Sequence, residues 1–297
     1  MSVGPGFVLV DKATGWTSHD VVAKARTLFR IRKIGHAGTL DPMATGLLVL
    51  GLGAATRLLR FITDQPKEYV ATACFGVTTD TLDADGEVLD RTPMEVGAAD
   101  VAEVMAGYVG EVLQVPPMFS AVRVGGKRLH DLARSGHKIE RSPRSVRVDR
   151  IGLEGFEPGV YPLVRFRVVG GRGLYVRVLA DDVAKALGGR AHLTALRRVR
   201  NGVLSVENAT GIDRIVALCR EDRLDRLVLT PNQGLAHLPP VEVPEDLVGA
   251  VSNGRRLPTE LVGSARADEP VRMVAGMRML AVYRIRGDRL SPEVVLP

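Results

Sequence analysis

The chain alternates between short apolar runs and segments whose apolar residues recur with the period of a helix. Residues 6–11 are an apolar run that predicts a short buried strand. Thr17 and Ser18 precede apolar residues at helical spacing up to Phe29, which predicts a capped helix. The rest of the first half predicts an apolar run at 47–52, a short helix to about residue 62, a strand at 69–75 and a helix at 98–108.

The second half of the chain is richer in strand-like patterns. Runs of alternating or β-branched residues predict strands at 146–153, 164–169 and 174–179. A helix is expected at 181–187, and helical segments near His192 and Ile212. Because strands and helices interleave without a regular βαβ rhythm, the pattern predicts an α+β fold with a mixed, largely antiparallel central sheet flanked by helices.

Prolines divide the chain near its C-terminal end. They stand at positions 231, 239, 240 and 244 and indicate a linker. Beyond them, an Asn-Gly pair at 253–254 and short β-like runs such as 279–284 predict a small β-domain. We therefore expect one large domain over residues 1–235 and a small one over 240–297.

Composition excludes several classes of protein. Hydrophobic residues make up 45% of the 297 positions, and no apolar run approaches the roughly 20 residues that a membrane span needs. The first residues carry no signal-peptide pattern, so we expect a cytoplasmic protein. Cys74 and Cys219 lack CxxC or Cys/His spacing, which argues against a disulfide framework and a structural zinc site.

The charge favours a polyanionic partner. The net charge is +6, and arginine, which dominates the basic residues, can bond two phosphate oxygens at once. Basic residues gather in three places that are candidates for nucleic-acid binding: Lys127 and Arg128, Arg141 and Arg144, and Arg197 and Arg198.

The segment 35–46 contains the strongest candidate for chemistry. It holds three glycines and a proline around Asp41, with His36 five residues upstream. An Asp-Pro pair usually caps a helix. Here the dense glycines instead let backbone approach a ligand closely, and the carboxylate lies within a loop. A second acidic segment, 81–92, resembles half of a calcium loop, but Thr81 and Thr92 stand where carboxylates are needed, so we expect a tight turn and no metal.

Motifs along the chain resemble those of one enzyme family, in the family's order. The loop at 35–46 resembles the catalytic motif of the TruB-type tRNA pseudouridine synthases, in which the aspartate of a G-H-x-G-x-L-D-P-x-A-T-G run is the nucleophile. Further segments resemble its D-K-P-x-G-x-T-S at 11–18, K-x-Y at 67–69, T-D-T-x-D-x-x-G at 79–86, substrate-gripping segment at 116–128, G-T-Y-I-R at 173–177 and L-R-R at 196–198. Three positions depart from the family pattern: Ala13, Leu174 and His130.

The resemblance implies a function and roles for individual residues. It implies that Asp41 is the catalytic carboxylate, that Arg177 is its salt-bridge partner, and that Tyr69 stacks on the uracil and assists at its C5 proton. It further implies substrate-binding roles for His36, Tyr175, Leu196, Lys12 and Lys67. The implied reaction converts uridine to pseudouridine by base flipping and needs no cofactor, because no group enters from outside.

The resemblance also implies the substrate and partners. The expected substrate is the uridine conventionally numbered 55 in the T loop of tRNA, with residues 116–150 gripping the arm and a PUA-like C-terminal domain binding RNA. We expect a monomer without an obligatory protein partner. Two alternatives remain open: a pseudouridine synthase that depends on guide RNA, and a tRNA-binding or folding chaperone without essential catalysis.

Overall fold

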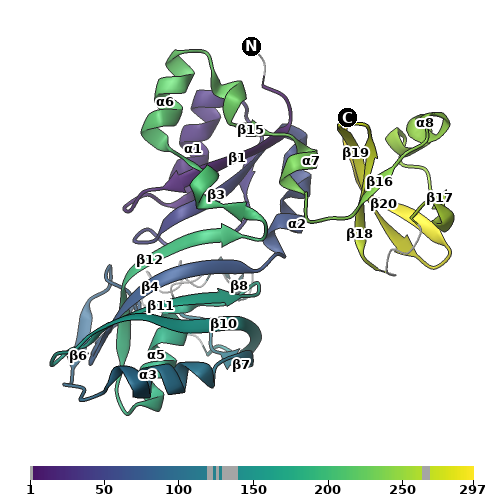
Figure 1. Cartoon of the computed structure of the whole chain (residues 1–297). Helices are drawn as coiled ribbons and strands as arrows, with labels where there is room; N and C mark the ends of the chain where they lie inside the picture. The colour runs from purple at the N-terminus through teal and green to yellow at the C-terminus, as the bar shows by residue number, and fades with distance from the viewer. Residues whose placement is uncertain (1–2, 119–122, 125–126, 129–139, 263–267) are drawn as a thin grey trace.

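The computed structural model describes residues 3–118, 123–124, 127–128, 140–262 and 268–297. Eleven strands form one large sheet, whose main path runs β14-β1-β3-β12-β4-β11-β10-β7 (Figure 1). The pairs β1–β14 and β3–β12 are parallel and the remaining pairs are antiparallel, so the expected mixed, largely antiparallel sheet is confirmed. The strands are β1 Gly6–Lys12, β2 Ile34–His36, β3 Thr45–Leu52, β4 Lys67–Phe75, β7 Gly110–Gln114, β10 Arg144–Glu157, β11 Leu163–Gly170, β12 Ala191–Asn201, β13 Leu204–Ser205, β14 Thr210–Gly211 and β15 Val228–Leu229.

Helices cover the sheet near its two ends, and two short hairpins lie beside it. One helix pair, α1 and α6, packs near β1, while α3 and α5 pack near β10 and β12 (Figure 1). The helices are α1 Ser18–Phe29, α2 Leu59–Thr63, α3 Ala98–Ala106, α5 Val176–Ala186, α6 Ile212–Arg220, α7 Pro231–Gly234 and α8 Val248–Ser252, and the hairpins pair β5 Val77–Thr79 with β6 Val88–Arg91 and β8 Arg123–Val124 with β9 Lys127–Arg128.

The predicted cap of the first helix is confirmed. The Thr17 hydroxyl accepts a hydrogen bond from the backbone N–H of Asp20 at 3.1 Å, and the Asp20 carboxylate accepts one from the Thr17 N–H at 2.9 Å. This reciprocal capping box fixes where the helix begins. It thereby fixes the position of Ser18, which touches the loop between β2 and β3.

Two predicted elements are wrong. Residues 174–179 belong mostly to α5, which starts at Val176, because buried residues at helical spacing, such as Leu179 and Val183, pack toward β12. The segment around His192 is not helical but opens β12, where it pairs with β4. Register shifts between 193 and 195 and between 198 and 200 interrupt the alternation that would identify this strand from sequence.

The predicted small C-terminal β-domain is confirmed as a second sheet. Its five strands follow the order β16-β18-β19-β20-β17. Pro231 opens the short helix α7 and Pro240 opens β16, so the proline-rich segment is only partly an irregular linker. The strands are β16 Pro240–Glu242, β17 Leu257–Pro258, β18 Pro270–Ala275, β19 Arg278–Arg286 and β20 Arg289–Val295.

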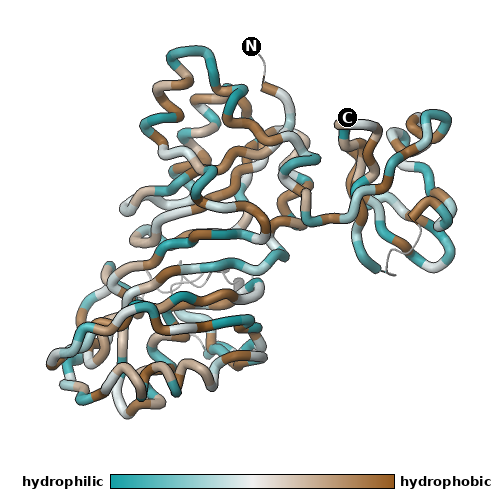
Figure 2. Tube along the Cα trace, in the orientation of Figure 1, coloured by the Kyte–Doolittle hydropathy of each residue, from teal (hydrophilic) through white to brown (hydrophobic). Residues whose placement is uncertain are grey.

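The two sheets share one apolar cluster. Buried Val282 and Val294 of the C-terminal sheet belong to the same hydrophobic cluster as Phe7 and Leu47 of the large sheet. Figure 2 shows hydrophobic stretches in both parts of the molecule and along the segment that joins them. Arg60 adds an ion pair to Glu293 at 3.0 Å across this contact. The C-terminal sheet is therefore packed against the large one and not merely tethered to it.

In the part of the chain that the structure describes, no helix is both long enough and apolar enough to cross a membrane.

Candidate active site

A cavity of about 400 Å³ opens beside the middle of the large sheet. Its wall combines the loop between β2 and β3, the glycine-rich turn before α5, and side chains of β4 and β12. The lining residues that the sequence singled out are Asp41, Lys67, Tyr69, Tyr175, Arg177, Leu196 and Arg198. Seven of the predicted site residues thus meet in one cavity of a size typical for small-molecule sites.

The sheet register explains how four of these side chains share one face. Lys67 and Tyr69 are two residues apart on β4, and Leu196 and Arg198 are two apart on β12. Since side chains alternate along a strand, each pair points to a single face. Arg198 lies directly opposite Tyr69 in the β4–β12 register, which brings the two pairs together beneath the cavity.

The loop that carries Asp41 is held at both sides of this residue. The Ser18 hydroxyl accepts a hydrogen bond from the Leu40 N–H at 2.8 Å. The Lys12 ammonium donates to the Pro42 carbonyl at 3.2 Å, and Lys12 is fully buried. Asp41 lies between these two anchored residues, so its position depends little on solvent or substrate.

Arg198 anchors the ends of the same loop. Its guanidinium donates to the carbonyls of Gly38 at 3.0 Å and Leu47 at 2.7 Å. Gly46 has φ +97°, and a Cβ at this position would lie 2.3 Å from the Arg198 carbonyl oxygen. Only glycine accepts this conformation at so close an approach, which accounts for a glycine that the motif contains.

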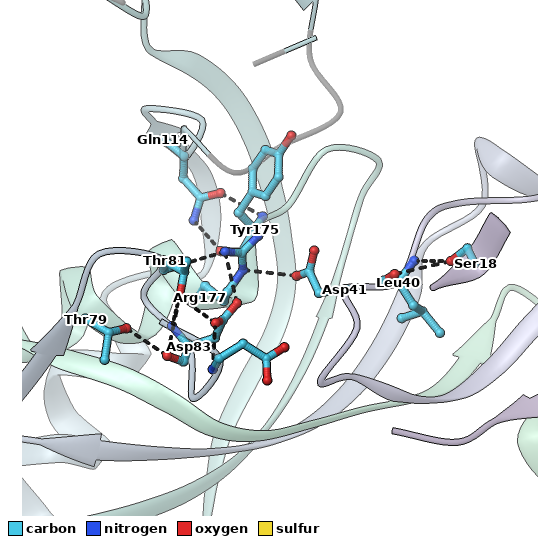
Figure 3. A network of polar contacts seen from close by, with 10 residues as sticks. Ser18, Leu40, Asp41, Thr79, Thr81, Asp83, Gln114, Tyr175 and Arg177 are labelled. Atoms are coloured by element: carbon cyan, nitrogen blue, oxygen red, sulfur yellow. Dashed lines mark hydrogen bonds and ion pairs between the residues drawn. The ribbon is translucent and has the colours of Figure 1, made fainter. Parts of the chain in front are cut away.

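Arg177 joins Asp41 to a second carboxylate. Its Nε lies 3.0 Å from Oδ2 of Asp41, and its Nη1 lies 3.2 Å from Oδ2 of Asp83 (Figure 3). The same Nη1 donates to the Thr81 carbonyl at 2.6 Å. The Arg177 side chain is only 3% exposed, whereas that of Asp41 is 33% exposed toward the cavity. The arrangement therefore leaves Asp41 reachable while its partner stays enclosed.

Asp83 is a site residue that our sequence reasoning missed. The turn at 79–86 is present as expected, and Asp83 is 5% exposed within it. Its Oδ1 accepts hydrogen bonds from the Thr81 hydroxyl at 2.5 Å and the Asp85 N–H at 3.2 Å. The signal was available, because Asp83 is the central carboxylate of a motif that resembles the family's T-D-T-x-D-x-x-G.

Gln114 is a second residue without a predicted role. It is 2% exposed at the end of β7, and its amide pairs with the backbone of Tyr175 in both directions (Figure 3). The Tyr175 N–H donates to Oε1 at 3.0 Å, and Nε2 donates to the Tyr175 carbonyl at 3.3 Å. This pairing fixes the residue that precedes α5, and hence the start of the helix that carries Arg177.

Burial and the neighbouring guanidinium have opposite effects on the pKa of the Asp41 carboxyl. Burial raises the pKa of the Asp41 carboxyl above its ordinary value, and the Arg177 guanidinium opposes that rise. Burial also lowers the pKa of Lys12 and of Lys67, each to about 8. Both lysines therefore carry their charge less readily than in water.

His36, Lys12 and Arg197 do not line the cavity. His36 lies on β2, and its ring meets that of His19 edge to face, with the ring centroids 5.8 Å apart. Its Nδ1 is buried without a hydrogen-bond partner among the described residues. Arg197 makes a two-pronged ion pair with Asp11, at 2.8 Å and 3.0 Å. The predicted substrate role of His36 and RNA role of Arg197 stay predictions.

The other predicted RNA-binding residues fall into three groups. Arg198 is 1% exposed and lines the cavity, so an RNA contact at this residue would lie inside the cavity and not on an outer surface; its RNA role stays a prediction. Arg144 is exposed at the start of β10, and Arg141 donates to the Pro116 carbonyl at 3.0 Å. Lys127 and Arg128 form β9, but their side chains lie outside the described part of the structure, as do residues 119–122, 125–126 and 129–139 of the expected gripping segment.

Known sequences that are similar to this chain belong to one enzyme family. The sequence model of the TruB family pseudouridylate synthase (N terminal domain) matches residues 26–176. A protein of Burkholderia pseudomallei (strain 668) is 39% identical over 292 residues, which cover 97% of this chain and 95% of the relative. A protein of Syntrophotalea carbinolica (strain DSM 2380 / NBRC 103641 / GraBd1) is 42% identical over 239 residues, 80% of this chain and 77% of the relative. Both relatives are named tRNA pseudouridine synthase B.

Solved structures resemble the whole chain. A chain of a Cbf5-Nop10-Gar1 complex superposes with a TM-score of 0.76 at 25% identity, covering 98% of this chain and 84% of that one. A chain of the archaeal box H/ACA sRNP Nop10-Cbf5 complex reaches a TM-score of 0.75 at 23% identity, covering 99% and 86%, which is a likeness of fold.

Proposed function

The chain belongs to the TruB family of pseudouridylate synthases, and from that premise we propose that it acts on the uridine numbered 55 in the T loop of tRNA, with Asp41 as the catalytic carboxylate. The coarser activity, conversion of uridine to pseudouridine in tRNA, follows from the family and its named relatives. The single observation that carries the residue assignment is the Asp41–Arg177 pair, which places a reachable carboxylate against an enclosed guanidinium at 3.0 Å.

The reaction is an isomerisation. The bond from C1′ of the ribose to N1 of uracil breaks, the base turns, and a bond forms from C1′ to C5. The C5 proton leaves and N1 gains a proton, so atoms balance without any added group. Asp41 supplies a carboxylate that reacts with or stabilises the electron-poor ribose or ring carbon. Arg177 favours the ionised form of this carboxylate, against the effect of burial, and orients it.

The cavity walls suit a base that has left its helix. Unstacking costs a few kcal/mol, and stacking on an aromatic ring recovers about 1–3 kcal/mol. Tyr69 presents a half-buried ring there, and Leu196 adds an apolar surface. We assign Tyr69 to stacking and to the C5 proton, Tyr175 to the uracil edge, and Lys12 and Lys67 to support of the site.

RNA recognition is assigned to surfaces around the cavity. Residues 116–150, with Arg141 and Arg144, would grip the tRNA arm through its backbone, and the C-terminal sheet would bind RNA as a PUA-like domain. We further propose that the protein works in the cytoplasm as a monomer, without a protein partner or a guide RNA. The relatives at 39% and 42% identity are named for tRNA, which favours this reading over a guide-dependent enzyme.

The test is release of tritium from C5 of uridine, because uridine and pseudouridine have equal mass. Purified protein without additives is incubated with transcribed tRNA labelled at C5, beside the Asp41→Asn variant and a tRNA in which uridine 55 is replaced by cytidine. We expect the wild type to release one equivalent of tritium from the tRNA that contains uridine 55. It should release none from the tRNA in which cytidine replaces that uridine. The variant should bind the tRNA and release none.

The alternatives predict different outcomes. A tRNA chaperone would bind and refold tRNA equally well with Asp41→Asn, and neither protein would release tritium. A guide-dependent enzyme would release tritium only after guide RNA and partner proteins are added. Equal release by wild type and variant would show that Asp41 is not the catalytic carboxylate.

A further inference from the structure

Arg198 is a buried cation without a carboxylate beside it. It is 1% exposed, and within the described residues it forms no ion pair. Arg177, which lines the same cavity, is also buried but has two carboxylates as partners. Removing a guanidinium from water is costly unless opposite charge compensates it. An anion supplied from outside the chain would provide that compensation.

The guanidinium of Arg198 is only partly used by the protein. Its Nε and Nη2 donate to the carbonyls of Leu47 and Gly38. Its Nη1 has no hydrogen-bond partner in the described part of the chain, and the side chain lines the cavity. A Cβ at Gly38 would lie 3.4 Å from this Nη1, so the glycine leaves room beside it.

Two further cations lie in the same wall of the cavity. Lys67 is 6% exposed and donates to the carbonyls of Thr63 and Gln65. Its pKa is lowered to about 8, first by burial and then by Arg198, with Arg172 contributing as well. Arg172 is 71% exposed at the rim, where it pairs with Asp64 at 2.9 Å. This wall therefore carries more positive charge than its own carboxylates balance.

We propose that Arg198, Lys67 and Arg172 form a phosphate seat, in which Nη1 of Arg198 binds the phosphodiester that flanks the flipped uridine. This inference rests on the proposed function, because a base that enters the cavity brings its own backbone phosphates to the cavity wall. It assigns Arg198 two tasks: two nitrogens hold the Asp41 loop and the third binds the substrate. Seating the phosphate would thus couple substrate position to the loop that carries the catalytic carboxylate.

The test changes the charge of the substrate and leaves the protein intact. A synthetic T stem-loop is made with a neutral methylphosphonate on the 5′ side or the 3′ side of the target uridine, and a control carries it in the stem. For the wild-type protein, the dissociation constant of each modified stem-loop is compared with that of the natural stem-loop. We expect one flanking methylphosphonate to weaken binding by about tenfold or more, as for loss of a charge-assisted hydrogen bond. The stem control should change binding little.

Protein variants then identify which residue binds the phosphate whose charge the methylphosphonate removes. Arg198→Gln should bind the natural stem-loop more weakly, and the flanking methylphosphonate should cause no further loss. Arg200→Gln is the matched control, because Arg200 is 50% exposed on the same strand and pairs with Glu68. This control should keep full sensitivity to the methylphosphonate. Lys67→Gln provides a second variant should Arg198→Gln fail to fold, and it should show a reduced sensitivity.

Two results would overturn the seat: equal binding of natural and both flanking methylphosphonate RNAs by wild type, or equal losses in wild type and Arg198→Gln. Tritium release from the natural stem-loop separates this proposal from the proposed function. Release together with insensitivity to methylphosphonate rejects the seat alone. Sensitivity without release rejects the assignment of the target uridine and leaves the phosphate seat in place.

Discussion

Arg177 is held between Asp41 and Asp83, with nitrogen–oxygen distances of 3.0 Å and 3.2 Å. Asp83 is buried, and the turn around it supplies it with hydrogen bonds from Thr81 and Asp85. Arg177 therefore orients the accessible carboxylate of Asp41, and the buried carboxylate of Asp83 in turn positions Arg177. The orientation of Asp41 therefore depends on Asp83, a residue that does not line the cavity.

Asp83→Asn should lower the single-turnover rate of tritium release by about 10–100-fold, with little change in the dissociation constant for tRNA. The substitution weakens one of the two ion pairs that orient Arg177, and misplacement of a positioned group by about 1 Å can cost about 100-fold. Asp85→Asn, compared at a pH above the acidic limb of the activity profile, is the matched control, because Asp85 belongs to the same turn but is exposed. Equal rates for wild type and Asp83→Asn would show that Asp83 does not position Arg177.

The acidic limb of the activity profile should lie above the ordinary pKa of aspartate. In the proposed mechanism the ionised Asp41 is the reactive form, so kcat/KM should fall as pH falls through the folded-state pKa of Asp41, which burial raises above 3.8. The charge of Asp85 also raises this pKa, so Asp85→Asn should move the limb to lower pH. Tritium release measured over a pH series checks both statements. A limb that moves to higher pH in Asp85→Asn would contradict the assignment.

Asp41→Asn should make the fold more stable near neutral pH while it abolishes activity. Because the pKa of Asp41 is raised on folding, its ionised form destabilises the folded state above the unfolded-state pKa. The advantage of the variant should shrink as pH falls through the folded-state pKa. Urea unfolding of both proteins at neutral and acidic pH measures it. A variant that is less stable at neutral pH would contradict this expectation.

Gly46→Ala should destabilise the protein far more than Gly15→Ala. Both glycines have positive φ, which costs about 1–2 kcal/mol for alanine. At Gly15 nothing lies within 4 Å of the added Cβ, whereas at Gly46 the Arg198 carbonyl oxygen would lie 2.3 Å away. Gly46→Ala must therefore also displace β12 from β3. Denaturant unfolding compares the two, and similar losses would argue against the close approach.

Val282→Ala in the C-terminal sheet should lower the stability of the large sheet by about 1–3 kcal/mol, because Val282 belongs to the cluster shared by both sheets. The chain's single tryptophan, Trp16, packs against the core of the large sheet and reports its unfolding by fluorescence. Val271→Ala is the control, since Val271 is fully buried in a cluster of the C-terminal part. A Trp16 transition that Val282→Ala leaves unchanged would show that the sheets unfold separately.

The sequence predicted the sheet class and most of the cavity, and it failed where tertiary contacts override local pattern. The motifs containing Asp41, Tyr69 and Arg177 identified residues that the fold brings together. The valines at 176 and 178 suggested a strand, but helix packing against β12 decides that segment.

The same limit applies to charged side chains. Arg198 follows Arg197 and is equally basic, yet strand alternation buries one and leaves the other 40% exposed. Charge counting could not distinguish them, because the face of a strand is set by its register with β4 and β3. Gln114 had no predicted role for a related reason, because its partner Tyr175 lies 61 residues away in the sequence.

The apolar cluster common to both sheets has a geometric consequence. Because residues of both sheets pack in it, the cluster sets the distance and direction from the cavity to the C-terminal sheet. Under the proposed function, an RNA that contacts both the cavity and the C-terminal sheet must match this span. Under the proposed function, this packing would select RNA by its dimensions and independently of its base sequence.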